Sequence, residues 1–311
     1  MERRPEAHIR RILREEVHFG CPVENCGSPY LTWHHFDPPW HIKHHQDLEG
    51  MIALCAEHHK KADAGAFTKD QIREFKAKPF LSSFRGGPGG IFDWRREQLL
   101  VRAGQMKVVN FSVLLELAGR PAIWLSRDEH GHELLNLDMW DSSGTLVFSM
   151  RDNEWVLLSK PEDFECPPSG RSLILRAPKF GIRLTIEFRS LSQSDFTNLI
   201  RQDTLAGNKR MVASLLADAK SARASGNEMR AMMLEDAVRS MDLDAGVDQV
   251  AKQWITDALK MAGGEIVLCD LTADYPFPVD VHLTPTRIRL PNNNIVSGGM
   301  AINVHTALSI G

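Results

Sequence analysis

The stretch LTWHHFDPPWHIKHHQDLEGMIALCAEHHKK, residues 31–61, contains three His-His pairs and one cysteine. Nine of the thirteen histidines in this 311-residue chain lie before residue 60. Imidazole nitrogen and cysteine sulfur are ligands that zinc and other first-row metals bind in proteins. The pattern therefore indicates that this part of the chain binds metal.

Two short-spaced pairs of donors predict a structural zinc site. Cys21 and Cys26 are separated by four residues, and Cys55 and His58 by two. Each pair fits a tight turn, and together they supply the four ligands of a closed zinc tetrahedron. The alternative is two unconnected cysteines and a surface histidine. Because so small a module has little core of its own, we expect its folding to be coupled to metal binding.

The remaining histidines suggest a second, open metal site. Trp33-His34-His35 ends a predicted strand, and His59 directly follows the last zinc ligand at the start of a predicted helix. A turn that fixes His58 also fixes His59, so His34 and His59 can face one metal ion while His35 keeps a free imidazole of near-neutral pKa. Phosphodiester hydrolysis needs such a pair, because the base activates water and the cation stabilises the developing charge.

These residues resemble a known family. Cys21-x4-Cys26, Trp33-His34-His35 and Leu54-Cys55-x2-His58-His59, with the surrounding DPPW, EGMIALC and HHKKADAG, are similar to the zinc-knuckle branch of the HNH endonucleases and to the broader ββα-metal nuclease fold. The resemblance covers about residues 18–78. It implies that His34 and His59 bind the catalytic divalent metal, that His35 is the general base, and that the substrate is DNA. It also implies a structural Zn²⁺ on the following four residues: Cys21, Cys26, Cys55 and His58. The catalytic ion is expected to be Mg²⁺, Mn²⁺ or another divalent ion.

One position departs from the family pattern. The asparagine in the middle of the family name lies five residues before the cysteine of the second knuckle, and that position is Gly50 here. Glycine has no side chain to tether the catalytic loop and orient the base. We expect that role to pass to Asp47, to His44 or His45, or to backbone groups. The departure leaves open a module that binds zinc and nucleic acid but cuts poorly or not at all.

Other residues near these motifs have two readings each. Trp40 is expected to pack against the module rather than stack on a base. Lys60 and Lys61 either contact the substrate backbone or belong to an ordinary exposed helix face. A predicted amphipathic helix near residues 9–17 either covers the module with solvated arginines or contacts phosphate through them.

Composition limits the class of protein. With 43% hydrophobic and 25% charged residues, the chain is expected to be globular. No apolar run reaches the ~20 residues of a membrane span, and the N-terminus lacks a signal-peptide core, so we expect a cytoplasmic protein with no membrane contact. The net charge is -3, and residues 1–85 hold 13 basic against 12 acidic residues. Contact with nucleic acid is therefore expected in a local groove.

The sequence predicts an α+β protein in three parts. Residues 1–81 form a small zinc-stabilised ββα-metal (HNH) domain preceded by the amphipathic helix. Residues 82–105 are a Gly/Pro-rich linker and connector, because SSFRGGPGG opposes regular structure. Residues 106–311 form a C-terminal domain of unknown role, β-rich over 106–191, helical over 192–262, and composed of short strands over 263–311. This domain is a candidate for target recognition, for regulation, or for binding a protein partner or a second copy.

Two other functions compete with a metal-dependent endonuclease. In one, residues 1–81 form a non-catalytic zinc module that binds nucleic acid. In the other, the chain is a nuclease effector of a defence system that stays silent until a signal or partner reaches the C-terminal domain.

Overall fold

The computed structural model describes most of the chain as a mixed α+β protein. The described residues are 2–83, 86–103, 106–242, 253, 256, 266–283, 288–290, 295–296 and 300–310. The α+β class predicted from sequence is confirmed. Much of the predicted helical region after residue 242 lies outside the described residues. The chain divides into two compact units, one of residues 1–189 with 268–311 and one of residues 190–267.

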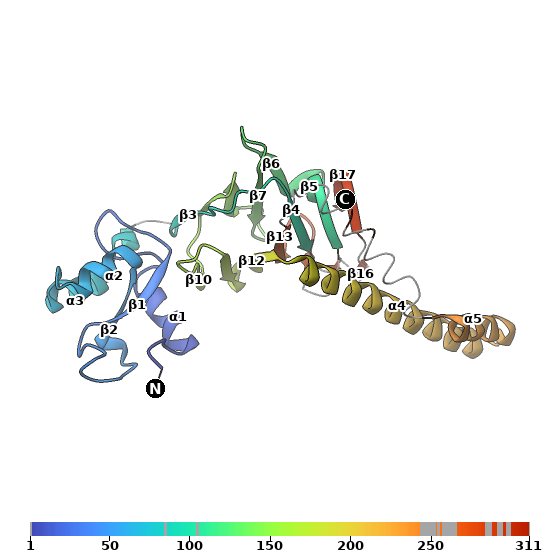
Figure 1. Ribbon diagram of the computed structural model, residues 1–311, viewed down its shortest axis with the longest axis horizontal. Coiled ribbons are helices and arrows are strands. Elements are labelled where there is room, and N and C mark those ends of the chain that lie inside the picture. Colours follow the sequence, from blue (N-terminus) through green and yellow to red (C-terminus); the bar gives the residue numbers. More distant parts are fainter. Residues whose placement is uncertain are drawn as a thin grey trace. The chain divides into compact units, whose positions relative to one another are not determined.

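The N-terminal module contains two antiparallel strands and three helices (Figure 1). Their bounds are α1 Ala7–Glu16, β1 Leu31–His35, β2 Met51–Cys55, α2 Ala56–Asp63 and α3 Lys69–Ala77, with short 3-10 helices at Leu48–Gly50 and Phe80–Ser83. Strand β1 pairs with β2 so that Leu31 faces Cys55 and His35 faces Met51. Helix α2 begins directly after β2, so the order from β1 to α2 is strand, strand, helix.

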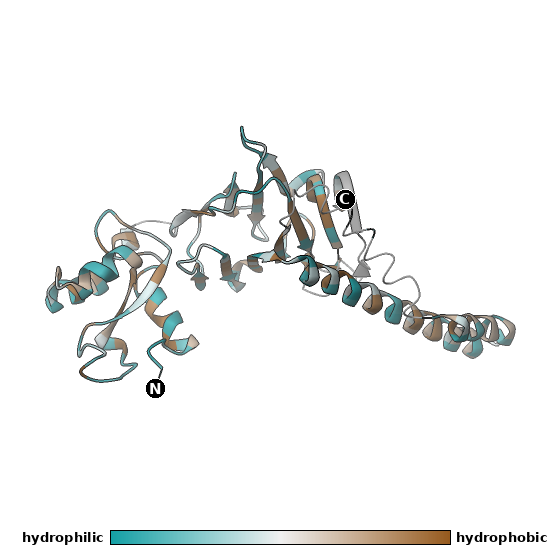
Figure 2. Cartoon of the chain, viewed as in Figure 1, coloured by the Kyte–Doolittle hydropathy of each residue, from teal (hydrophilic) through white to brown (hydrophobic). Residues whose placement is uncertain are grey.

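The module has a small apolar core. All five residues of β2 are buried, and they share one apolar cluster with Leu13 of α1, Val17 directly after α1 and Ile72 of α3. In Figure 2, α1 and α3 carry both hydrophilic and hydrophobic residues, as expected of helices with one face on a core. Thr68 and Gln71 form the capping box that starts α3. The core therefore holds β2 in place, together with α2, the helix that contains His58 and His59.

The N-terminal module contacts the large sheet through α1. Arg14 is only 4% exposed, and its guanidinium donates hydrogen bonds of 2.8 and 3.1 Å to Asp163. Arg176 also pairs with Asp163 at 2.7 Å. The expectation that the α1 arginines face solvent or phosphate is wrong for Arg14, because its guanidinium forms an ion pair with a buried carboxylate. Breaking a buried ion pair costs about 3–5 kcal/mol, so this contact fixes α1 on the sheet.

Fifteen strands among the described residues belong to or join one curled sheet, which is mostly antiparallel. They are β3 Gly89–Ile91, β4 Leu99–Ala103, β5 Met106–Leu117, β6 Arg120–Arg127, β7 Glu133–Trp140, β8 Leu146–Arg151, β9 Glu154–Leu157, β10 Asp163–Glu165, β11 Ser172–Ala177, β12 Ile182–Leu191, β13 Ile266–Tyr275, β14 Val281–Leu283, β15 Ile288–Arg289, β16 Ile295–Val296 and β17 Met300–Ile310. The path runs β10-β11-β12-β13-β4-β5-β6-β7-β8-β9-β3, and β17 pairs in parallel with β5. Strands β3 and β4 come from the segment expected as a linker and connector.

The second unit contains a helical hairpin. Helix α4 spans Gln193–Ala224 and α5 spans Glu228–Ser240, with Gly226 at the turn in the left-handed conformation at φ 79°. Small side chains of both helices, Ala219, Ala222 and Ala231, are buried between them. No helix among the described residues is long and apolar enough to cross a membrane.

Candidate metal centres

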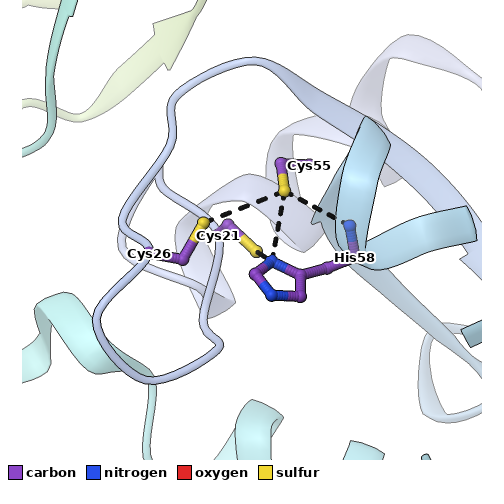
Figure 3. A group of neighbouring side chains, drawn as sticks. All are labelled: Cys21, Cys26, Cys55 and His58. Carbon is purple, nitrogen blue, oxygen red and sulfur yellow. Dashed lines mark hydrogen bonds between the residues drawn. The ribbon is translucent and has the colours of Figure 1, made fainter. Parts of the chain in front are cut away.

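The first cluster consists of Cys21, Cys26, Cys55 and His58, whose ligand atoms all lie within 4.8 Å of one another (Figure 3). The sulfur atoms of Cys26 and Cys55 are 3.8 Å apart, and His58 Nδ1 lies 3.3 Å from Cys55 Sγ and 3.4 Å from Cys21 Sγ. A zinc tetrahedron with Zn–S near 2.3 Å has edges of roughly 3.8 Å between sulfurs and about 3.6 Å between sulfur and nitrogen. The distances between the four predicted ligands therefore agree with the dimensions of a zinc site.

The chemistry of this cluster also fits a cation. Burial raises the pKa of the Cys21 and Cys26 thiols, and burial lowers the pKa of His58. Three thiolates in one buried place repel one another, whereas a bound zinc ion deprotonates its thiol ligands outright. Cys55 also caps α2, because its Sγ accepts the backbone N–H of His58 at 3.5 Å. The cluster can hold a metal such as zinc at the junction of β2 and α2.

The second cluster consists of His34, His59 and Asp63, and their ligand atoms also lie within 4.8 Å of one another. His34 is the second-last residue of β1, while His59 and Asp63 are four residues apart on one face of α2. Asp63 Oδ1 is 3.2 Å from His34 Nδ1, and Asp63 Oδ2 is 3.6 Å from His59 Nε2. Burial is the main cause that lowers the pKa of both histidines, so their metal-binding neutral form prevails at neutral pH. Two nitrogen donors and one oxygen donor suit a divalent first-row ion or Mg²⁺.

Sequence reasoning placed His34 and His59 in this cluster but did not include Asp63. Asp63 lies four residues after His59 in the helix that starts at Cys55. That spacing was the available signal, because residues four apart on a helix project from the same face. The carboxylate is 54% exposed, whereas His34 is 8% exposed. The cluster is therefore open on the side of Asp63.

His35 lies beside the second cluster with a free imidazole. Its ring is 5% exposed, and neither ring nitrogen has a hydrogen-bond partner among the described residues. The ring packs 4.8 Å from Trp40 and 5.1 Å from His45, centroid to centroid. Burial and the neighbouring His45 lower the pKa of His35 to about 4, so the near-neutral pKa expected from sequence is too high. At neutral pH this imidazole is uncharged and has a lone pair to accept a proton.

A cavity of about 410 Å³ opens beside His35 and the second cluster. His34, His35 and Asp63 line it, so the cavity adjoins the second cluster. Arg3 also lines it, and so does Lys69, whose ammonium pairs with Asp37 at 2.6 Å. A cavity with these walls can take an anionic group next to the His35 imidazole and the side chains that could hold a metal ion.

Position 50 has no room for a side chain. A Cβ atom on Gly50 would overlap the Asp37 carbonyl oxygen and lie 2.8 Å from His45 Cε1. The Gly50 carbonyl accepts the backbone N–H groups of Phe36 at 2.9 Å and Asp37 at 3.2 Å. The chain therefore passes too close to itself here for the asparagine that the family pattern places at this position.

His45 connects the two ends of the intervening loop. Its side chain is buried, its Nε2 lies 2.8 Å from the Pro38 carbonyl oxygen, and its Nδ1 accepts the Asp47 backbone N–H at 3.1 Å. Because Nδ1 accepts, Nε2 carries the proton and donates to Pro38. The same ring packs edge-on against His35. Of the residues suggested to replace the asparagine, His45 is the one in contact with His35, whereas His44 and Asp47 are exposed.

The remaining predicted residues have simple surroundings. Trp40 packs between His35 and the exposed ring of His44, which stacks on the indole with the ring centroids 4.4 Å apart. The prediction that Trp40 packs against the module is therefore confirmed. Lys61 pairs with Glu57 at 2.6 Å on α2.

No protein-family model, curated protein or solved structure matches this chain.

Proposed function

We propose that the chain is an HNH-type endonuclease that hydrolyses phosphodiester bonds in DNA with a divalent metal ion. The observation that carries the proposal is the meeting of His34, His59 and Asp63 with the unpartnered imidazole of His35 beside one cavity. A metal site alone would not need a buried free base next to it. A buried base alone would not need three metal-binding side chains.

His35 is assigned the role of general base. Its neutral ring accepts a proton from a water molecule as the water oxygen forms a bond to phosphorus and the bond from phosphorus to the departing oxygen breaks. By hydrogen-bond geometry neither ring nitrogen has a partner among the described residues, so the lone pair is available for this proton. His34, His59 and Asp63 would hold the divalent ion, which supplies charge stabilisation at the phosphate.

The first cluster is assigned a structural role. Zinc on Cys21, Cys26, Cys55 and His58 uses all four positions of the tetrahedron, so it has no open position for substrate. It would join the turn after α1 to the start of α2 and so set the position of His59, the residue next to His58. We infer that this ion stabilises the fold of residues 1–81 and takes no part in the reaction.

His45 is assigned the positioning role that the family pattern gives to an asparagine at position 50. It contacts the base directly and fixes both ends of the loop that contains Trp40. A buried polar residue with both ring nitrogens bonded can hold a loop in one conformation. This assignment explains how a glycine can stand at position 50 in a cleaving enzyme.

DNA is the proposed substrate because the cavity joins a phosphate-hydrolysing arrangement to positive charge. Arg3 and Lys69 lie in the cavity lining, whereas residues 86–311 contain 24 basic and 28 acidic residues. The acidic balance of this larger part argues for recognition of a target, assembly or regulation rather than for general DNA binding. We place the protein in the cytoplasm, where its thiols stay reduced and available for zinc.

A plasmid-nicking assay tests the proposal. Supercoiled and linear DNA are incubated with wild-type protein, His35→Ala and the control His130→Ala, in Mg²⁺, Mn²⁺, Ni²⁺ or chelator, with zinc measured in each protein. His130 is an exposed histidine on the β6–β7 turn and does not line the cavity. Wild type and His130→Ala are expected to nick DNA, and His35→Ala is expected to lose at least about 100-fold in rate, the usual range for a lost acid or base, with unchanged zinc.

The other outcomes decide against the proposal. Equal nicking by His35→Ala removes His35 from the role of base. DNA binding with no metal-dependent nicking in any protein favours the non-catalytic zinc module.

A further inference from the structure

We propose that Thr32 sets the tautomer and orientation of His59 and thereby aims the Nε2 lone pair of His59 at the second metal site. The inference rests on the proposed divalent ion at His34, His59 and Asp63. It adds a positioning residue that does not itself touch the ion.

The hydroxyl of Thr32 can donate only one hydrogen, and its partners decide where that hydrogen goes. Thr32 Oγ1 lies 3.0 Å from the Leu54 carbonyl oxygen and 2.7 Å from His59 Nδ1. A carbonyl oxygen can only accept, so the hydroxyl hydrogen is directed to Leu54. Thr32 Oγ1 must then accept at the shorter contact, and His59 Nδ1 must carry a proton.

That assignment leaves His59 Nε2 with the lone pair. Nε2 is buried without a hydrogen-bond partner among the described residues and lies 3.6 Å from Asp63 Oδ2. The ring of His59 is 5.0 Å from the ring of His34, centroid to centroid. A bare, buried nitrogen facing a carboxylate and another imidazole is the arrangement of a metal ligand whose other nitrogen is held by a neighbouring group.

The strands place Thr32 for this task. Thr32 is directly opposite Leu54 in the β1–β2 pair, so its hydroxyl and the Leu54 carbonyl belong to neighbouring strands held in register. Residues two apart on a strand point to the same face, so Thr32 and His34 both project from the same face of β1. Thr32 also has a branched Cβ, which restricts its side chain to few rotamers. One face of β1 thus supplies a metal ligand and the group that orients a second ligand.

The residue also joins the two clusters. Leu54 immediately precedes Cys55, a residue of the first cluster. The Thr32 hydroxyl donates a hydrogen bond to the Leu54 carbonyl. The chain of hydrogen bonds runs from His59 through Thr32 to the strand that ends at Cys55. Zinc at the first cluster would therefore help to hold the Leu54 carbonyl in place. Through Thr32, that carbonyl would orient His59 in the second cluster.

Metal affinity tests the role of Thr32 without measuring cleavage. Mn²⁺ binding to the full, zinc-loaded chain is measured by calorimetry for wild type, Thr32→Val, Thr32→Ser and the control Thr204→Val. Valine keeps the shape of threonine and removes the hydroxyl, whereas serine keeps the hydroxyl. Thr204 is half-buried and its hydroxyl donates to the Ile200 carbonyl at 2.8 Å, so its loss removes a similar bond far from His59 in the sequence.

We expect Thr32→Val to weaken Mn²⁺ binding by about 10- to 100-fold, the usual cost of losing a group that orients a metal ligand. Thr32→Ser is expected to stay within about threefold of wild type, because the hydroxyl is the group that orients the ligand. Thr204→Val and the zinc content of all four proteins are expected to be unchanged. Wild-type affinity in Thr32→Val overturns the inference.

The tautomer gives a second measurement that needs no second metal. In zinc-loaded protein with labelled histidines, nitrogen NMR of the His59 ring is expected to show a proton on Nδ1 in wild type, and a changed tautomer ratio in Thr32→Val. A proton on Nε2 in the wild-type ring overturns the inference. Absence of Mn²⁺ binding in wild type overturns the proposed second site together with the role of Thr32 toward it. Mn²⁺ binding that depends on Thr32, without any DNA nicking, keeps Thr32 and rejects the nuclease.

Discussion

The two candidate metal centres use adjacent histidines of the same helix yet differ in the number and the kind of their other donors. His58 joins three sulfurs in a cluster with four donors, whereas His59 joins one nitrogen and one oxygen in a cluster with three. Cys21 and Cys55 are buried, while Asp63 is 54% exposed beside the cavity. Four donors close a zinc site, and three leave a position for substrate or water. One helix therefore contributes to two donor clusters, to which we assign a role in folding and a role in the proposed reaction.

The largest effect is expected from removing a ligand of the first cluster. Cys55→Ser should abolish zinc binding and unfold residues 1–81, because binding of structural zinc contributes about 10–16 kcal/mol in small zinc modules. Zinc per chain and resistance to limited proteolysis measure the result. Cys166→Ser is the control, since Cys166 is also buried but lies outside the cluster. A Cys55→Ser protein that keeps its zinc and its protease resistance contradicts the structural role.

The second-largest effect is expected at the open cluster, and it should leave the fold intact. Asp63→Asn removes a charge without changing the shape of the side chain, and nicking should fall by at least about 100-fold through loss of transition-state stabilisation. Zinc content should stay at the wild-type value, because Asp63 is not one of the four donors of the first cluster. Asp70→Asn, an exposed substitution on α3, is the matched control. If both variants cleave alike, the two clusters do not differ in the way proposed.

The difference between the clusters also shows what the sequence could predict. The first cluster consists of two pairs, each close in sequence, so spacing alone identified all four residues. His34 and His59 followed from the strand that ends at His35 and from the fixed position next to His58. Asp63 was missed because its position depends on the length and orientation of α2. The helix must continue for two turns and must turn His59 and Asp63 toward β1. The spacing of the motif residues does not require either.

The large sheet was predictable in kind but not in order. The sequence predicts a β-rich region over residues 106–191, and β5 to β9 do pair in the order in which they follow along the chain. The placement of β13 between β12 and β4, and of β17 parallel to β5, joins segments far apart in the chain. Such pairings depend on which edges remain available after the local strands have paired, and the sequence pattern carries no information about that. Gly50 is similar, because its need for glycine arises from the Asp37 carbonyl thirteen residues earlier.

Gly50→Ala tests the loop that lies between β1 and β2, the strands that carry His34 and Cys55. The new methyl group would overlap the Asp37 carbonyl and press on His45, so we expect a loss of about 1–3 kcal/mol in the free energy of unfolding, as for other overpacked sites. Denaturant titration measures it. Gly207→Ala in α4 is the control, because the nearest atom to a Cβ there is 3.8 Å away and alanine favours a helix. Equal stability of Gly50→Ala and wild type would show that the loop can move aside.

His45→Phe tests whether the base is organised separately from the metal. Phenylalanine keeps a ring against His35 but leaves the Pro38 carbonyl and the Asp47 N–H without their partner. We expect a loss of about 1–3 kcal/mol in stability from the unpaired groups and a smaller fall in nicking rate than in Asp63→Asn, with unchanged Mn²⁺ affinity. His44→Phe, on an exposed ring that stacks on Trp40, is the control. A fall in Mn²⁺ affinity in His45→Phe would mean that base and metal are not independently held.

The smallest effect is expected from Lys61→Gln, and its absence is informative. Lys61 pairs with Glu57 and lies three residues after His58, so it belongs to the face of α2 near the first cluster. Lys69 also has a carboxylate partner, Asp37 at 2.6 Å, but it lines the cavity. If DNA meets the open cluster, Lys61→Gln should leave the salt dependence of DNA binding unchanged, while Lys69→Gln should reduce the slope of log affinity against log salt by about 1. The reverse result would place DNA over the zinc face of α2, and His35 could not then be the group that activates water.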